Sequence, residues 1–415
     1  MTPNRLKIAV AAAGIGHVTR GVEVWANELA AALAAYDQDV ILFRGSGNPS
    51  RSYERLIPCW RRDDPRTKRF VAWLPRFLWR LGIKSVYGIE QTSFALGILR
   101  FLRSLQIDIL HVQDLPLARI VQAARKWRLI RTRVILGHGT DEPDTTISKF
   151  EYLQHLTPWH LEKAKARGCW KPTWSAIPNF VNTERFTPGS APQLREKLGI
   201  PANAMVVLTS AAITVSVKRV DRLLDGFSEF RAQYPDVPAW LVVAGGRTRD
   251  TDNLIASAQA RLGNRVHFLI NHPPNQMAEL YRIADVFALV SDREMMPVAL
   301  LEAMASGLPC IVHRYPVLEW VAGPGGRVVD MAVPGALVAA LYELLNDPPG
   351  RTDLGRAARD YCINNFSRET VIGQILSYYQ HVMGQTPHPS RSHPRSNPNT
   401  DRVQCTSIEH SLPAK

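Results

Sequence analysis

The chain has 415 residues, of which 46% are hydrophobic and 21% charged, and 50 Lys and Arg stand against 37 Asp and Glu. This composition is typical of globular proteins and excludes a fibrous or wholly disordered chain, and the length predicts two or three domains. The formal net charge of +13 favours an anionic partner, such as a phosphate-bearing small molecule, an acidic membrane surface or nucleic acid.

The five cysteines are scattered along the chain, and no C-x-x-C motif occurs. This pattern argues against a disulfide framework and a zinc site, and it favours a reducing compartment, so we expect a cytoplasmic protein. No apolar run approaches the roughly 18 residues that a membrane-spanning helix needs. Residues 6–14 could be read as a short signal peptide, but they run directly into a Gly-rich turn and a helix pattern.

Apolar strand patterns alternate with segments of helical period in both halves of the chain. The N-terminal half predicts strands at 8–13, 40–43, 107–112 and 134–136, with helices at 21–36, 90–104 and 116–128. The C-terminal half predicts strands at 206–210, 240–244, 266–270, 286–290 and 310–313, with helices at 220–233, 254–262, 277–283 and 297–306. The expected fold class is therefore α/β, with two Rossmann-like doubly wound domains that face each other across a ligand-binding cleft.

Prolines and composition shifts place the expected boundaries. We expect an N-terminal Rossmann-like domain over 1–172 and a C-terminal one over 173–365, because Pro172, Pro178 and Asn179 punctuate the junction. Residues 366–384 should form a closing helix that returns to the N-terminal domain. Residues 385–415 are rich in Pro, Ser and Asn without an apolar period and should be a disordered tail.

The most informative segment is SDREMMPVALLEAMASGLP, residues 291–309, which follows a predicted strand. Pro297 suits the first position of a helix and Gly307 its end, so the head of a short helix should point toward the cleft. Such a head binds anions well, pyrophosphate included. Glu294 lies just before the helix and Glu302 inside it; sugar hydroxyls could satisfy both carboxylates, or they could be a capping acid and a paired residue at the core edge.

The spacing Glu294-x7-Glu302 followed by AMASGLP resembles the E-x7-E signature of retaining, nucleotide-sugar-dependent glycosyltransferases of the GT-B fold, family 4. Residues 176–188 (AIPNFVNTERFTP) resemble the crossover segment of that family, residues 218–227 (KRVDRLLDGF) its helix start, and residues 357–367 its closing segment. The resemblance covers about residues 170–384, with weaker similarity over 6–36.

The resemblance implies specific roles in binding the donor. Glu302 would hold the donor ribose and Glu294 would lie beside the donor sugar, with Met295, Met296 and Val298 in the donor loop. Met295 departs from the glycine that is usual there. No metal and no cofactor are expected, because the donor itself is the substrate.

Lys218 would neutralise the diphosphate leaving group. The arginine that usually precedes this lysine is missing, since Ile213 and Val215 occupy the candidate positions, and Arg219 could compensate. A solvated lysine at a helix start is the alternative for Lys218.

Two further loops resemble cleft loops of the family. Gly16 and Gly21 lie in the first turn between strand and helix, whose spacing is not G-x-G-x-x-G, so a nicotinamide cofactor is disfavoured. His138, between two glycines at a strand end, resembles a histidine that contacts the donor sugar. An ordinary Rossmann turn and a satisfied loop histidine are the respective alternatives.

The expected function is transfer of a sugar, with retention, from a nucleotide-diphosphate donor to an unidentified acceptor such as a lipid-linked one or a polysaccharide. The departing phosphate would deprotonate the acceptor, because no separate acid and carboxylate nucleophile stand out. Met295 and the missing arginine motivate an alternative, a nucleotide-sugar-binding protein that transfers little or nothing. A GT-B sugar-nucleotide epimerase or phosphorylase is a further alternative.

Residues 51–84 hold ten basic against three acidic residues, an excess of seven out of the total of +13. Aromatic and basic residues recur there at helical spacing, which is typical of a peripheral membrane-surface helix. A core helix with a solvated basic face is the alternative, and the local character of the charge argues against nucleic-acid binding. The candidate membrane-contacting residues are Phe70, Trp73, Arg76, Phe77 and Arg80.

Overall fold

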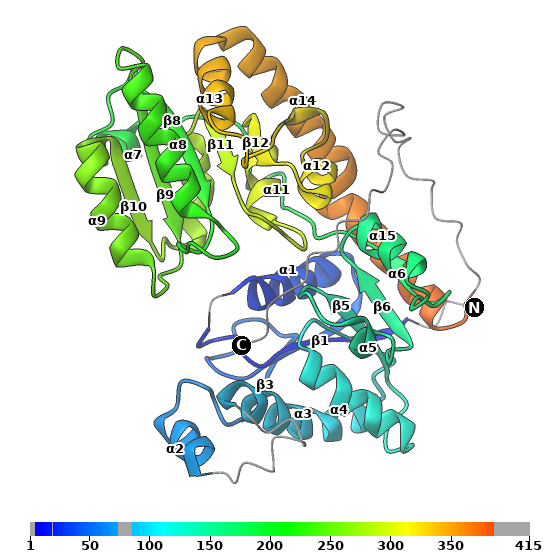
Figure 1. Cartoon of the computed structure of the whole chain (residues 1–415). Helices are drawn as coiled ribbons and strands as arrows, with labels where there is room; N and C mark the ends of the chain where they lie inside the picture. Colours follow the sequence, from blue (N-terminus) through cyan, green and yellow to red (C-terminus); the bar gives the residue numbers. More distant parts are fainter. Residues whose placement is uncertain (1–4, 19, 74–84, 386–415) are drawn as a thin grey trace.

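The computed structural model describes residues 5–18, 20–73 and 85–385. Within this part of the chain, two parallel sheets form two stacked domains, and helices cover both faces of each sheet (Figure 1). The expected fold class is thereby confirmed. Its physical basis is visible in the sequence, since apolar runs of strand length alternate with helix-period segments and each sheet is buried on two sides.

The N-terminal sheet has the order β3-β2-β1-β4-β5-β6-β7, and all of its registered pairs are parallel. Its chain order reverses at β1, which pairs with both β2 and β4, so loops after β1 and β4 meet at a switch point. The strands are β1 (Lys7–Ala12), β2 (Asp39–Arg44), β3 (Glu54–Leu56), β4 (Ile109–Val112), β5 (Arg133–His138), β6 (Tyr152–His155) and β7 (Ser175–Ala176). The helices are α1 (Gly21–Ala35), α2 (Pro65–Trp73), α3 (Val86–Ser104), α4 (Leu115–Lys126), α5 (Asp144–Ile147) and α6 (Pro158–Ala166).

The C-terminal sheet has the order β10-β9-β8-β11-β12-β13 and is likewise parallel. Its switch point lies between β8 and β11. The strands are β8 (Met205–Ser210), β9 (Ala239–Gly245), β10 (Val266–Ile270), β11 (Val286–Leu289), β12 (Cys310–His313) and β13 (Gly326–Val329). The helices are α7 (Pro192–Lys197), α8 (Val220–Gln233), α9 (Thr251–Leu262), α10 (Met277–Arg282), α11 (Val298–Ala305), α12 (Pro316–Ala322), α13 (Ala336–Asn346), α14 (Pro348–Phe366) and α15 (Arg368–Val382).

Strand β1 shows how the two-residue period of a strand builds a core on each face of its sheet. Ile8 and Val10 belong to the apolar cluster on the α1 face, whereas Ala9 and Ala11 belong to the cluster on the α3 and α4 face. All four side chains are fully buried. The apolar start of the chain is therefore a central strand, and a fully buried aliphatic side chain such as Ile8 contributes about 1.5–3 kcal/mol.

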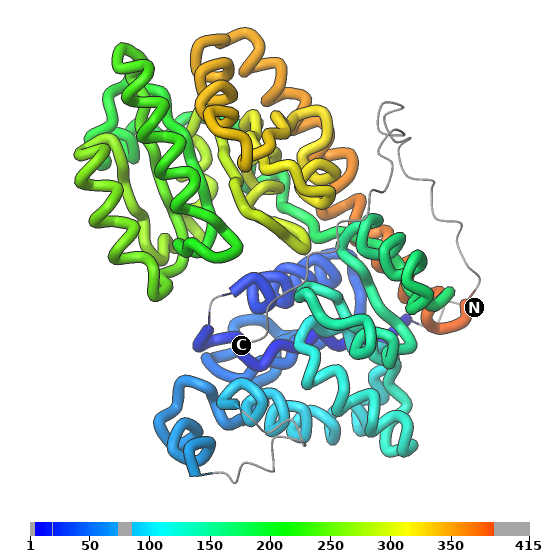
Figure 2. The backbone as a smooth tube through the Cα atoms, viewed as in Figure 1, coloured from blue at the N-terminus to red at the C-terminus, as the bar shows by residue number. Residues whose placement is uncertain are grey.

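The last helix, α15, packs on the N-terminal domain although it follows the C-terminal one (Figure 2). The hydroxyl of Tyr379 lies 2.8 Å from Nδ1 of His111 in β4, and the hydroxyl of Tyr378 donates to the carbonyl of Thr173 at 2.7 Å. Beside it, the amide of Val181 donates to the carbonyl of Phe366 at 2.9 Å. The two chain crossings between the domains therefore run side by side.

Two details differ from the sequence-based expectation. Residues 175–176 still pair with β6, so the N-terminal sheet extends past the expected boundary at 172. Helix α11 begins at Val298, because Pro297 has φ −78° and ψ 105° and is the cap rather than the first helical residue. The described part of α2 is Pro65–Trp73, and residues 74–84, like the expected tail from 386 onward, lie outside the described residues.

Candidate functional site

The head of α11 provides the first element of the site. The helix leaves the carboxyl end of β11 after a short loop, and no side chain caps its amino end. The amide of Leu300 donates to the carbonyl of Pro297 at 3.1 Å, so the amides of Val298 and Ala299 remain for a ligand, and the helix dipole adds a partial positive charge there. Val298, the first residue of the helix, and Glu302, one turn later, both line a cavity.

This cavity has a volume of about 410 Å³ and lies between the two domains. Val24 and Glu28 of α1 line its N-terminal side, and Ser210 and Gly245, at the ends of β8 and β9, line its C-terminal side. Position 245 requires glycine, because the backbone of Ala211 lies so close that a Cβ atom at this position would be 1.7 Å from the carbonyl oxygen of Ala211. The size falls within the range of roughly 300–1,000 Å³ that is usual for small-molecule sites.

Glu302 is held in place by Tyr281 of α10, whose hydroxyl donates to Oε2 of Glu302 at 2.8 Å. Burial raises the pKa of Glu302 to about 7, although the hydrogen bond from Tyr281 and the nearby charge of Arg185 act in the opposite direction. The carboxyl group therefore combines a fixed position with an ionisation that responds near neutral pH.

Lys218 and Glu294 form an ion pair next to the loop before α11, although neither residue lines the cavity. Lys218 precedes α8, and its Nζ lies 2.6 Å from Oε1 of Glu294 in the loop before α11. The Glu294 side chain is 8% exposed, while that of Lys218 is 29% exposed. The structure thus brings together two residues that stand 76 positions apart in the sequence.

The donor-loop candidates are placed differently from one another. Met295 is partly buried, whereas the side chain of Met296 is buried in the core of the C-terminal domain. The carbonyl of Met296 accepts a hydrogen bond from Nδ2 of Asn179 at 3.5 Å. Because its side chain packs inward, only the backbone of Met296 is available to a ligand.

The expected compensation by Arg219 is not supported by its contacts. Its guanidinium lies 3.0 Å from a carboxylate oxygen of Asp221 and 3.3 Å from one of Asp292, so two acids already surround its charge. Ile213 is fully buried among apolar residues. Among the described residues, the arginine that lines the cavity is instead Arg185, which lies in the segment 176–188 and to which the sequence alone assigned no role.

The Gly-rich turn shapes the N-terminal side without lining the cavity. Gly16 has φ +98°, and a Cβ atom there would lie 2.2 Å from the carbonyl oxygen of Ser46. Only glycine combines that backbone conformation with so close a contact. Gly21 is the first residue of α1, and apart from its chain neighbours and its own helix no described residue lies within 4 Å of the Cβ that it lacks.

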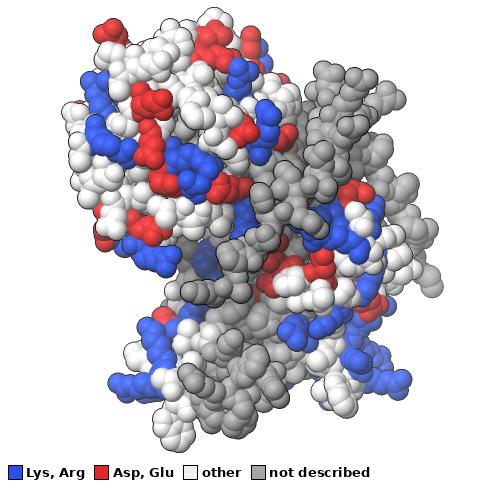
Figure 3. Space-filling model, viewed as in Figure 1, with Lys and Arg blue, Asp and Glu red and all other residues white. Residues whose placement is uncertain are grey.

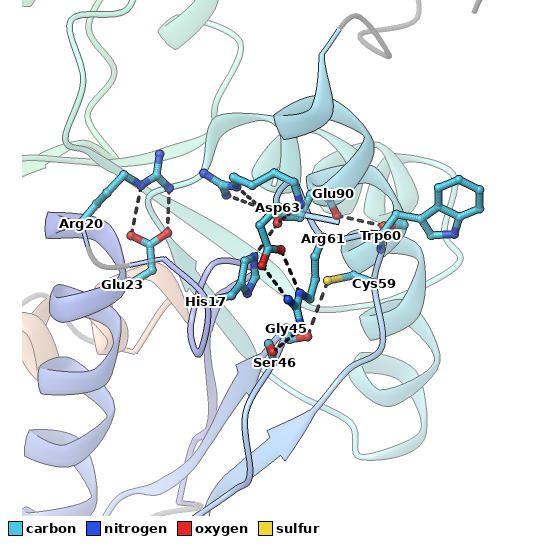
Figure 4. A network of polar contacts seen from close by, with 12 residues as sticks. His17, Arg20, Glu23, Gly45, Ser46, Cys59, Trp60, Arg61, Asp63 and Glu90 are labelled. Atoms are coloured by element: carbon cyan, nitrogen blue, oxygen red, sulfur yellow. Dashed lines mark hydrogen bonds and ion pairs between the residues drawn. The ribbon is translucent and has the colours of Figure 1, made fainter. Parts of the chain in front are cut away.

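A buried polar network fixes this turn, and sequence reasoning missed it (Figure 4). The carboxylate of Glu90 in α3 is fully buried; it lies 2.7 Å from Nε2 of His17 and accepts from the backbone amide of Arg62 at 2.8 Å and from its Nε at 2.6 Å. In the same view Arg20 pairs with Glu23. The network joins the turn after β1, the segment before α2 and the helix α3.

A second buried carboxyl group lies at the switch point of the N-terminal sheet. Asp114 follows β4 and accepts a hydrogen bond from the hydroxyl of Tyr87 at 2.7 Å. Burial raises the pKa of Asp114 to about 6. Only a tertiary contact marks this residue, since in the sequence it resembles an ordinary helix-capping aspartate.

His138 lines a separate, smaller cavity and not the 410 Å³ one. Its Nδ1 lies 3.2 Å from Nδ1 of His155, and burial lowers the pKa of His138 to about 4, so the ring is neutral at pH 7. The two cavities are linked by the loop before α11, because Nη1 of Arg293 lies 3.2 Å from Oδ2 of Asp141 beside His138. Among the described residues no cluster of His, Cys, Asp and Glu is arranged to hold a metal ion.

The membrane-surface candidates are partly described. Trp73, at the end of α2, is 88% exposed, and Phe70 is 40% exposed. The Phe70 ring packs against that of Trp60, with centroids 4.9 Å apart. Arg76, Phe77 and Arg80 lie outside the described residues. None of the helices in the described ranges is both long and apolar enough to span a bilayer.

Comparison with known proteins finds a family match within the C-terminal domain. Residues 190–361 match the family model of glycosyl transferases group 1. The matched segment contains α8, β11 and α11, and therefore Lys218, Glu294 and Glu302.

Individual relatives agree with this match. The chain is 28% identical, over 53% of its length and 54% of the relative, to a D-inositol 3-phosphate glycosyltransferase of Corynebacterium urealyticum. It is 30% identical, over 48% of its length and 55% of the relative, to a GDP-mannose-dependent alpha-(1-6)-phosphatidylinositol monomannoside mannosyltransferase of Mycolicibacterium smegmatis. The chain thus spans about half the length of these relatives.

Among solved structures, a sucrose-phosphate synthase from Thermosynechococcus elongatus is similar over 92% of this chain and 100% of that one. The TM-score is 0.73 and the sequence identity 19%. At this identity the likeness concerns the fold, and it extends across both domains.

Proposed function

We propose that the chain transfers a sugar from a nucleoside-diphosphate donor to an acceptor, with retention of configuration, because residues 190–361 match the family model of glycosyl transferases group 1 and the two-domain fold is GT-B. The observation that carries the proposal is the interdomain cavity. It combines the uncapped head of α11 with Glu302 on its wall, and Glu294, in the loop before α11, pairs with Lys218, which precedes α8.

The donor would lie with its nucleoside in the 410 Å³ cavity. The two ribose hydroxyls would donate hydrogen bonds to Glu302, because an ionised carboxylate can accept two hydrogen bonds at once. The diphosphate would lie against the free amides at the head of α11, within reach of Lys218. The sugar would then lie beside Glu294, between the two domains.

In the transfer step, the bond between the anomeric carbon and the diphosphate oxygen breaks as the acceptor oxygen bonds to the same face of that carbon. The acceptor proton passes to the departing phosphate. The protein contributes positioning and stabilisation of the negative charge that develops on the leaving group, through Lys218 and the helix amides. Glu294 holds Lys218 in place through the 2.6 Å contact.

The alternative of a donor-binding protein without turnover is motivated by the charges that Arg219 already neutralises. A binding protein would show affinity for the nucleotide sugar but no release of nucleoside diphosphate. An epimerase would convert the nucleotide sugar into its epimer, and a phosphorylase would form a sugar phosphate, in each case without a glycosylated acceptor.

The acceptor side includes a surface suited to an anionic membrane. Helix α2 carries Arg66, Lys68 and Arg69, all exposed, beside the exposed aromatic rings of Phe70 and Trp73. Basic side chains at this end of the N-terminal domain are visible at the lower left of Figure 3. Cations around exposed aromatic rings favour the interface of an acidic bilayer. We therefore include peripheral membrane docking, toward a lipid-linked acceptor, in the proposal.

One experiment tests the proposed chemistry. UDP, GDP and their sugars are screened for binding by thermal shift, since a ligand that binds the folded state raises its apparent stability. With the donor so identified, the anomeric configuration of the product is determined by NMR. We expect nucleotide binding, acceptor-dependent release of nucleoside diphosphate and a product that keeps the donor configuration. An inverted product would overturn retention, and binding without release would favour the binding protein.

A further inference from the structure

A second cavity, of about 180 Å³, lies at the carboxyl ends of β5 and β6. Three histidines from different elements line it: His138 ends β5, His155 ends β6, and His160 lies in the first turn of α6. The volume equals that of about six water molecules at roughly 30 Å³ each. It accommodates one small polar ring and is too small for a nucleotide.

The two innermost histidines present unsatisfied nitrogen atoms. His138 is 6% and His155 1% exposed, and Nε2 of each ring is buried without a hydrogen-bond partner in the protein. A buried polar atom without a partner is costly, so each Nε2 requires a partner from outside the chain.

The contact between the two rings determines which partner suits them. Their Nδ1 atoms lie 3.2 Å apart, so one Nδ1 must donate and the other accept. In neutral imidazole the two nitrogens of a ring have opposite roles. One of the free Nε2 atoms is therefore a donor and the other an acceptor, whichever tautomers are present. Hydroxyl groups, which donate and accept at once, match this pair.

The charges around the cavity oppose an anionic ligand. Asp141, Glu142 and Asp144 line it together with only two cations, Lys163 and Arg167. Nη1 of Arg167 already donates to a carboxylate oxygen of Asp144 at 3.0 Å. A phosphate or carboxylate would face an excess of negative charge, whereas sugar hydroxyls would find carboxylate acceptors.

The position of the cavity points to the acceptor. Asp141 on its rim contacts Arg293, the neighbour of Glu294, and Val298, in the same C-terminal segment, lines the nucleotide cavity. In the sequence, Glu294 therefore lies between Arg293, which contacts the rim of the histidine cavity, and Val298, which lines the nucleotide cavity. A ring in the histidine cavity would lie on the far side of the donor sugar from the nucleotide.

We propose that this histidine cavity binds a neutral, hydroxyl-rich ring of the acceptor, a sugar or a cyclitol, and presents one of its hydroxyls to the anomeric carbon of the donor. His155 and His138 are positioning residues for that ring; His138 is thereby assigned to the acceptor instead of the donor sugar, because it lines this cavity and not the nucleotide cavity. The inference rests on the proposed function, because it names the acceptor class for the same reaction.

The test uses the full chain, saturated with UDP or GDP, whichever binds. Two neutral rings, myo-inositol and methyl α-D-glucoside, are titrated by calorimetry, alongside the anionic L-malate and glucose 6-phosphate. The variants are His155→Ala and Asp144→Asn, and His381→Ala on the exposed side of α15 is the matched control. Asp144→Asn keeps the shape of the side chain. If His155→Ala does not fold, Asp144→Asn alone tests whether the cavity binds the ring.

We expect a neutral ring to bind the wild-type chain and the His381→Ala control equally. His155→Ala should weaken that binding at least tenfold and Asp144→Asn at least threefold, while the dissociation constant of the nucleotide changes less than twofold. The proposal is overturned if neutral rings do not bind, if both variants bind them as the wild type does, or if the anionic compounds bind more tightly. Absence of UDP and GDP binding would overturn the proposed donor instead, and titration of the nucleotide-free chain would then decide the cavity alone.

Discussion

Nζ of Lys218 lies 2.6 Å from Oε1 of Glu294, and this ion pair joins the start of α8 to the loop before α11. The lysine therefore has a carboxylate partner within the chain. In the proposed function, a bound diphosphate would compete for the same ammonium group or share it. The pair would then couple occupation of the phosphate position to the placement of Glu294.

Lys218→Ala should lower the rate of nucleotide-sugar turnover by about 10²–10³-fold, the effect typical of removing one group that stabilises developing negative charge. Affinity for nucleoside diphosphate should fall with it, whereas affinity for the nucleoside should not. Steady-state kinetics and calorimetry measure the two effects. Lys197→Ala on α7 removes an exposed lysine from the same domain and should change neither. Unchanged turnover in Lys218→Ala would exclude a role on the leaving group.

Glu294→Gln should separate binding from chemistry. The amide keeps the shape of the side chain but leaves Lys218 without its carboxylate partner, so we expect turnover to fall while the dissociation constant of the nucleoside diphosphate changes less than threefold. Single-turnover rates at saturating donor measure the first quantity. Equal losses in binding and in rate would assign Glu294 to the phosphate site rather than to the sugar.

Glu302 gives the donor site a predictable pH dependence. Its pKa is raised to about 7 by burial, and only the ionised form accepts both ribose hydroxyls. Ionisation rises from a minor to a major fraction between pH 6 and pH 8, so the affinity for a nucleoside diphosphate should increase roughly tenfold over that range.

The same shift affects stability with the opposite sign. The folded state holds the proton more tightly than the unfolded one, so this group's contribution to the free energy of unfolding falls as the pH rises from 4.5 to about 7.

Calorimetric titration at several pH values measures the affinity for the nucleoside diphosphate. The phosphate of the ligand also titrates. Glu302→Gln lacks the titrating carboxyl group but binds the same phosphate, so it serves as the control. A wild-type profile parallel to that of the variant would show that Glu302 does not bind the ribose.

Much of this site could be predicted from local patterns. The residues of α11 combine apolar periodicity with a proline at the head and a glycine at the end, and the spacing of Glu294 and Glu302 is a property of eight consecutive steps along the chain. Lys218 could be placed because it closely precedes another predicted helix, 220–233. Such predictions are possible because a helix that follows a parallel strand begins at the carboxyl edge of the sheet, and ligands bind at this edge in doubly wound folds.

The remainder depends on contacts between distant segments. Glu90 lies on a helix whose sequence gives no reason for a buried charge, and its partners His17 and Arg62 come from other loops. His155 and His138 pair because β5 and β6 are neighbours in register, with His138 opposite His155. No spacing rule along the chain predicts such a pair without the register.

Glu90 should be the most sensitive position in the N-terminal domain. Glu90→Ala removes the carboxylate that His17 and Arg62 share in the interior, and the loss of one partner from a buried ion pair costs about 3–5 kcal/mol. Hydrogen exchange of the α3 amides reports the change locally and avoids the assumption of two-state unfolding of two domains. Glu162→Ala, in an exposed pair with Lys165, should cost less than about 1 kcal/mol. Equal exchange in both variants would show that the network does not stabilise the domain.

The basic surface of α2 can be tested by separating charge from aromatic contact. Replacing Arg66, Lys68 and Arg69 together by Gln should weaken binding to anionic vesicles roughly 100-fold, since each basic side chain near such a surface contributes about 1 kcal/mol. Co-sedimentation with vesicles of neutral and of acidic lipid measures the partition coefficients. Trp73→Ser should weaken binding to both kinds of vesicle, because it removes an 88% exposed ring, whereas Trp127→Ser after α4, at 77% exposure, should leave both unchanged. Equal sedimentation of the triple variant and the wild type on acidic vesicles would show that α2 is a solvated face and does not dock the domain on a membrane.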